Sequence, residues 1–146
     1  MITPSHAHAS AHSSTRVAMA WGAGFGLLQA ATPLAFWWLP AATVYALGLA
    51  VIAAIYIGFA VADGRPKVIA VESVVTSAFV LLAAIAVTGT AWLLVAGLLA
   101  HSLKDLWQHR TEFVAGTRWW PPFCAVIDVV AASIIAVEIL AGVHFR

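Results

Sequence analysis

The sequence predicts an all-α integral membrane protein, a single bundle of five transmembrane helices. Two observations lead to this prediction: 63% of the 146 residues are hydrophobic while only 9% are charged, and the hydrophobic residues form long runs. A soluble domain has about 25% charged residues, and a chain with so few would lack the polar groups to cover its surface in water. Contact with lipid removes that requirement.

The first apolar run, 17–39, is the least regular of the five. It follows one basic residue, Arg16, and is too long for the apolar part of a signal peptide, so we expect a retained helix. Gly22 and Gly26 lie one helical turn apart, which indicates close packing against a neighbouring helix. If this run enters and leaves on one side of the membrane, the bundle has four crossings instead of five. The polar stretch 1–15 is expected to be a disordered cytoplasmic tail.

The remaining runs cover 41–62, 68–88, 91–109 and 123–143. Each is close to the roughly 20 residues that a helix needs to cross the hydrocarbon core. Proline, glycine and charged residues separate them, as expected at helix ends. We therefore expect one transmembrane domain, 16–146, after the tail.

The basic residues predict the orientation of the chain. With five crossings, six of the seven basic residues fall on one side of the membrane: Arg16, Arg65, Lys67, Lys104, Arg110 and Arg118. Lysine and arginine collect on the cytoplasmic side. The sequence thus predicts a multi-pass protein of the inner (plasma) membrane, with its N-terminus in the cytoplasm and its C-terminus outside.

The fourth run carries polar residues at regular spacing. His101, Asp105 and His109 are four residues apart, and on a helix each step of four turns the position by only about 40°, so the three share one face. Glu72 and Asp128 fall at a similar depth in the runs on either side. Ionisable groups inside a membrane are costly, and they usually mark functional sites.

Two imidazoles and several carboxylates suit a zinc, manganese or non-haem iron ion held between helices. We expect His101, His109, Asp128 and Glu72 to be metal ligands, and Asp105 to be a ligand or a catalytic acid/base group. The most concrete function is then a small metal-dependent membrane enzyme, whose cytoplasm-facing site acts on a lipophilic or membrane-proximal substrate.

Several alternatives stay open. His101 could bind haem or a pigment, because Gly97 one turn earlier leaves room for a flat ring. The same groups could conduct protons, or form a structural network in which Lys104 extends to the headgroups. If these groups bind a cofactor or are structural, the protein would be a non-enzymatic accessory subunit of a larger membrane complex. Its partners would be the lipid bilayer and such a complex or further copies of the chain.

Other classes of function are disfavoured. The formal charge is +1 with no basic stripe, so we expect no nucleic-acid partner. The sequence contains no H-E-x-x-H, C-x-x-C or phosphate-binding loop motif. Its one cysteine, Cys124, excludes an intrachain disulfide and lies at the rim of the predicted polar layer.

Overall fold

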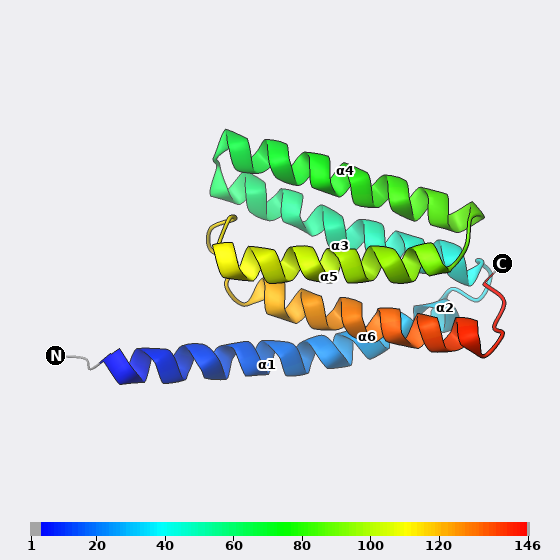
Figure 1. Ribbon diagram of the computed structural model, residues 1–146, viewed down its shortest axis with the longest axis horizontal. Helices are drawn as coiled ribbons and strands as arrows, with labels where there is room; N and C mark the ends of the chain where they lie inside the picture. Colours follow the sequence, from blue (N-terminus) through cyan, green and yellow to red (C-terminus); the bar gives the residue numbers. More distant parts are fainter. Residues whose placement is uncertain (1–3, 146) are drawn as a thin grey trace.

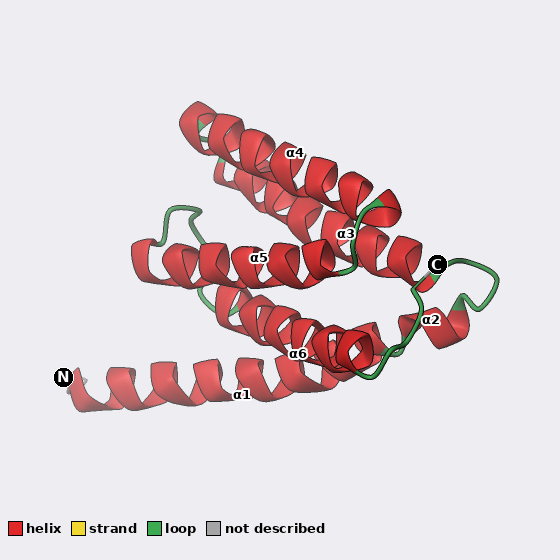
Figure 2. Ribbon diagram, turned by 45° about the vertical axis from the view of Figure 1, so that its right-hand side comes forward, coloured by secondary structure: helices red, strands yellow, loops and turns green. Residues whose placement is uncertain are grey.

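The computed structural model describes the backbone of residues 4–145 and the side chains of residues 14–145. This part of the chain is helical apart from short connections (Figure 1, Figure 2). The helices are α1 (Pro4–Ala30), α2 (Thr32–Ala35), α3 (Ala41–Asp63), α4 (Pro66–Thr88), α5 (Trp92–Thr111) and α6 (Trp120–Leu140). The predicted tail, 1–15, overlaps the start of α1. Most of its side chains lie outside the described part, so the expectation of disorder stays a prediction.

Three of these helices are long and apolar enough to cross a membrane: α3 and α4 with 23 residues each, and α6 with 21. The fold class predicted from sequence is confirmed to that extent, as a helical protein with three candidate membrane spans. α5 has 20 residues but carries a polar second half, and α1 begins with the polar residues of the tail. The five crossings stay a prediction.

The first apolar run does not form one helix to residue 39. α1 ends at Ala30, and the short helix α2 follows at once. Pro33 explains the break, because it has no N–H to donate and its ring would collide with the carbonyl group of Gln29 in a continuous helix. The Thr32 hydroxyl donates to that same carbonyl oxygen at 2.6 Å, which satisfies one of the acceptors freed at the helix end.

The five long helices lie side by side, with successive ones running in opposite directions (Figure 1, Figure 2). α5 and α6 form a central hairpin, α3 packs against α4 and α5, and α1 packs chiefly against α6. Leu49, Leu94 and Ile135 have no exposed surface, and they fill the space between α3, α5 and α6. Lipid tails are as apolar as leucine, so helices in a membrane gain no hydrophobic free energy when they associate. The packing of these side chains therefore stabilises the bundle by close van der Waals contact.

The two glycines singled out in the sequence make the contact of α1 with α6. A Cβ atom on Gly22 would lie 2.5 Å from the carbonyl oxygen of Phe123, and one on Gly26 would lie 2.7 Å from Cβ of Val130. Neither position has room for a side chain. The predicted close helix packing is therefore present, with α6 as the neighbour.

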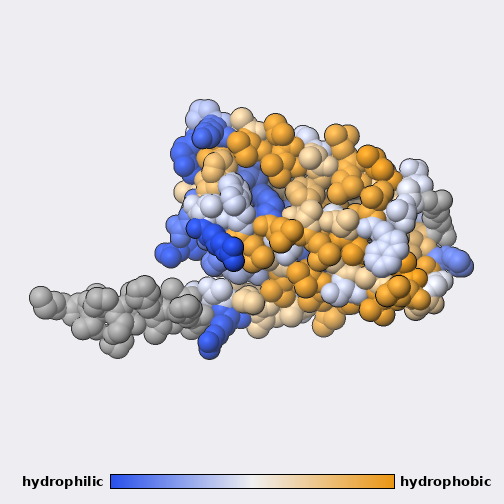
Figure 3. Space-filling view, in the orientation of Figure 1, coloured by the Kyte–Doolittle hydropathy of each residue, from blue (hydrophilic) through white to orange (hydrophobic). Residues whose placement is uncertain are grey.

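One end of the molecule is more polar than the rest. The α3–α4 turn and the α5–α6 loop lie together at this end, as does the N-terminal side of α1 (Figure 1). Hydrophilic residues gather there, while hydrophobic residues cover most of the remaining visible surface (Figure 3). We call this the polar end. Arg65 and Arg118 lie in its two connections, and Lys67 and Arg110 lie in the adjoining ends of α4 and α5.

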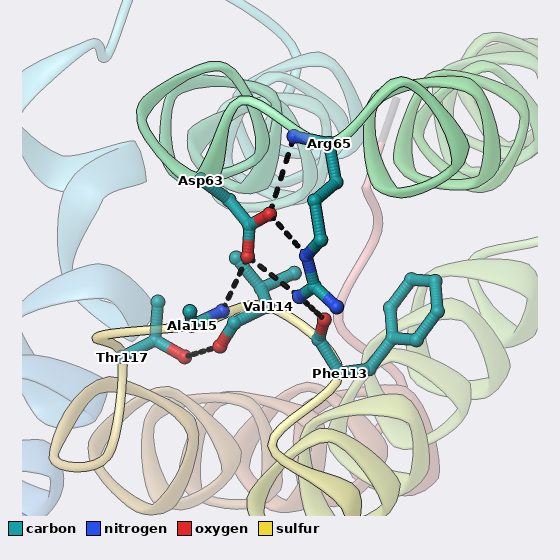
Figure 4. A network of polar contacts seen from close by, with 6 residues as sticks. All are labelled: Asp63, Arg65, Phe113, Val114, Ala115 and Thr117. Atoms are coloured by element: carbon teal, nitrogen blue, oxygen red, sulfur yellow. Dashed lines mark hydrogen bonds and ion pairs between the residues drawn. The ribbon is translucent and has the colours of Figure 1, made fainter.

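Asp63 joins the two connections of the polar end (Figure 4). Its carboxylate accepts hydrogen bonds from Arg65 Nε at 2.6 Å and from the Ala115 backbone N–H at 2.7 Å. Arg65 in turn donates to the carbonyl oxygen of Phe113 at 2.6 Å. The turn is sharp because Gly64 adopts a left-handed conformation with φ 77°, which favours glycine. The hydrogen bond to Asp63 also raises the pKa of Arg65 above its already high usual value.

Candidate metal centre

Two pairs of side chains face each other across the α5–α6 hairpin. His101 and Asp105 lie four residues apart on α5, and Cys124 and Asp128 lie four residues apart on α6. A spacing of four places both members of each pair on one face of their helix. One potential ligand atom from each residue lies within 4.8 Å of those of the other three. All four residues are at most 1% exposed.

Direct contacts link three members of this group, which we call the inner cluster (His101, Asp105, Cys124 and Asp128). Nδ1 of His101 lies 2.8 Å from Oδ2 of Asp128 and 3.5 Å from Oδ2 of Asp105. The hydroxyl of Tyr56, on α3, donates to Oδ1 of Asp105 at 2.6 Å. Tyr56 thus fixes the orientation of one carboxylate, and His101 lies between the two.

Other atoms of the inner cluster are buried without a hydrogen bond among the described residues. They are Nε2 of His101, Oδ2 of Asp105 and Oδ1 of Asp128. Buried polar atoms in proteins usually have a hydrogen-bond partner, so each exception requires an explanation. A bound cation would give the unpaired carboxylate oxygens of Asp105 and Asp128 an electrostatic partner.

A second pair of charged residues lies beside the inner cluster. Nζ of Lys104 is 2.8 Å from Oε2 of Glu72, on α4, and 2.9 Å from the centre of the Tyr56 ring. Glu72, Asp105 and Asp128 together bring three buried carboxylates against the one ammonium group of Lys104, which leaves a formal charge of −2 when His101 and Cys124 are neutral. Burying net charge is costly unless it is compensated. A divalent cation or added protons would offset it.

The residues predicted from the sequence separate into two sets. His101, Asp105 and Asp128 come together, as expected from their depth. Glu72 is buried but pairs with Lys104, and His109 is half-buried and lies outside the inner cluster. The helix explains the position of His109, because eight residues turn it about 80° away from His101.

Two residues contribute to the site beyond those predicted from the sequence. Cys124 was placed only at the rim of the polar layer, although its spacing of four from Asp128 repeats the spacing used to find His101 and Asp105. Tyr56 was overlooked because it lies in an otherwise apolar run. Lys104 also differs from the expectation of a side chain extended to the headgroups, since only 11% of its side chain is exposed.

The haem or pigment alternative required open space beside His101. A Cβ atom on Gly97 would lie 2.6 Å from a methyl group of Leu49 and 3.1 Å from one of Leu82. The Phe79 ring also packs edge-on against the imidazole, with centroids 5.0 Å apart. Side chains therefore occupy the space that a flat ring next to Gly97 would need.

Chemically, the inner cluster offers one nitrogen, one sulfur and two carboxylate donors. This set can hold a transition-metal ion, and it can also hold protons. Comparison of the chain with protein-family models, characterised proteins and solved structures finds no match in any of the three. Geometry alone therefore supports the assignment of this site.

Proposed function

We propose that this protein is a multi-pass membrane protein that holds a divalent transition-metal ion in its inner cluster. The observation that supports this best is the meeting of four potential ligands, from two facing helices, within 4.8 Å and out of contact with solvent. The buried excess of carboxylates is the second support, because a divalent cation would offset most of the negative charge that they and a Cys124 thiolate carry together.

The donor set narrows the choice of metal. A thiolate with an imidazole and carboxylates suits zinc or iron, whereas manganese prefers oxygen ligands. His101 would bind through Nδ1, the ring nitrogen nearest to both carboxylates, and Cys124 would bind as the thiolate.

The closed site favours holding the metal over catalysis. Structural zinc sites use four protein ligands, whereas catalytic sites keep one position open for water or substrate. The metal-dependent enzyme expected from the sequence stays a prediction, because Asp105 would have to leave the metal to open such a position. An accessory subunit of a larger membrane complex fits four buried ligands more directly.

We also propose five crossings of the inner membrane, with the polar end in the cytoplasm. The antiparallel order of the five long helices supports this arrangement (Figure 1). So do the basic residues of the α3–α4 turn and the α5–α6 loop, which share the polar end. His101 lies ten residues before the end of α5, so the metal would lie about 15 Å inside that end.

Metal analysis of the protein purified in mild detergent tests the proposal. We expect about one zinc or iron ion per chain, and at least a tenfold loss in His101→Ala and in Asp128→Ala, because each removes a ligand. Ser102→Ala is the matched control. Ser102 is buried on the same helix, and its hydroxyl donates to the carbonyl oxygen of Ala125 at 3.3 Å, not to a side chain of the inner cluster. Equal metal content in all four proteins would refute the metal assignment.

A proton-conducting role is the second candidate, and one observation favours it. The hydrogen bonds of Tyr56 with Asp105 and of His101 with Asp128 already form a chain of exchangeable protons. Such chains of carboxylates and histidine are typical of proton relays in membranes. Protein in liposomes would then dissipate a pH gradient faster than the Asp128→Asn variant, whereas a metal-holding protein would leave the gradient unchanged in both.

A further inference from the structure

A groove separate from the inner cluster runs between α1, α3 and α6, at the end opposite to the polar end. Its volume is about 390 Å³, within the range of small-molecule sites. Apolar side chains line it, including Phe25, Leu28, Phe36, Leu47, Val51 and Ile127. Several of them are exposed, Leu28 by 63% and Val51 by 60%, so the groove is open to the surroundings of the helices.

Two polar side chains, Gln29 and Thr32, lie in this apolar surface, and the Thr32 hydroxyl already donates to the Gln29 carbonyl oxygen. Nε2 of Gln29 is buried and has no hydrogen-bond partner among the described residues. The amide packs directly over Gly48 of α3, where a Cβ atom would come within 2.8 Å of it. Gly48 therefore makes room for the amide. An unpaired N–H donor in apolar surroundings is costly. Nε2 is covered where the amide packs on Gly48, so the Gln29 side chain, which lines the groove, would rotate to give this donor to the carbonyl oxygen of an otherwise apolar ligand.

The depth of Gln29 identifies the ligand. It lies one residue before the end of α1, next to the α1–α3 connection that contains Trp37 and Trp38. Exposed tryptophans mark the interface between headgroups and hydrocarbon. The ester carbonyl groups of glycerolipids lie at that interface, and their acyl chains extend inward, as the groove does from Gln29 toward Ile127.

We infer that this groove binds one acyl chain of a membrane glycerolipid, whose ester carbonyl oxygen accepts a hydrogen bond from Gln29. This site requires only that the helices lie in a membrane, and it is independent of the metal proposed above.

Native mass spectrometry of the full chain in detergent tests the inference, with added phosphatidylethanolamine as the probe. We expect one lipid to bind the wild type and to be lost in Val51→Trp, which fills the groove. Val74→Trp is the matched control, because Val74 is 71% exposed on α4, away from the groove. Equal binding by both tryptophan variants would mean nonspecific surface lipid and would overturn the site.

The hydrogen bond is tested with a second lipid, the diether analogue, which lacks ester carbonyl groups. The wild type should bind the diester about fivefold more tightly, as expected for one hydrogen bond, and Gln29→Leu should bind both lipids equally. An equal affinity for the two lipids in the wild type would overturn the role of Gln29. A dimer that Val51→Trp dissociates would show that a second copy of the chain, not lipid, covers the groove.

Discussion

Replacing Lys104 with methionine should destabilise the protein strongly. Methionine keeps the apolar stem of the side chain but removes the ammonium group that lies 2.8 Å from Glu72. Glu72 is 1% exposed, and its carboxylate has no partner other than Lys104 among the described residues. Its charge would then be buried without compensation.

The size of the effect follows from the burial of the pair. Removing one partner of a buried ion pair costs about 3–5 kcal/mol. We expect the lower value, about 3 kcal/mol, because the Lys104 side chain keeps 11% exposure. For a chain of this length 1 kcal/mol corresponds to about 2–4 °C, so the melting temperature in detergent should fall by about 6–12 °C.

Two further variants make this test specific. The double variant Lys104→Met with Glu72→Gln should recover most of the lost stability, because it removes both charges of the pair. Lys67→Met, at an exposed position near the start of α4, should change the melting temperature by no more than about 1–2 °C. If Lys104→Met melted like Lys67→Met, Lys104 would extend to the headgroups and the buried pair would not exist.

Two other predictions concern the fold. Gly22→Ala should lower the free energy of unfolding by about 1–3 kcal/mol, because its Cβ would lie 2.5 Å from the carbonyl oxygen of Phe123. Gly24→Ala should leave the free energy of unfolding unchanged, because its Cβ would have no neighbouring atom within 4 Å. Denaturant titration in detergent measures both effects, and equal effects would contradict the packing of α1 on α6. A reporter fused to the C-terminus should be active only outside the cytoplasm, and one in the α5–α6 loop only inside it; a cytoplasmic C-terminus would contradict the five crossings.

The apolar runs predict the helix positions well where proline and glycine residues mark the ends of a run. The runs 41–62 and 68–88 correspond to α3 and α4 within two residues at each end. Gly64 and Pro66 stop one helix and start the next, which sequence alone reveals. The first run was harder to place. Proline also occurs within membrane helices, so the pattern does not reveal whether Pro33 bends a helix or ends it.

The sequence predicts how far along the helices the site residues lie, but not which of these residues contact one another. An antiparallel order of runs brings His101 and Asp128 to one level, and this needs only the positions of the helix ends. Which residues touch depends on how each helix is rotated about its axis. The rotation of α5 that points His101 at α6 turns His109 away, and the rotation of α6 that points Asp128 at α5 brings Cys124 into the inner cluster. Apolar runs without a marked polar face do not specify these angles.

X-ray absorption at the metal edge of the purified protein tests the central claim most directly. The inner cluster predicts one sulfur ligand at about 2.3 Å together with nitrogen and oxygen ligands at about 2.0–2.2 Å. Cys124→Ser should abolish the sulfur signal. A spectrum without sulfur, unchanged in Cys124→Ser, or the absence of a stoichiometric metal would contradict the assignment of His101, Asp105, Cys124 and Asp128 as one metal centre.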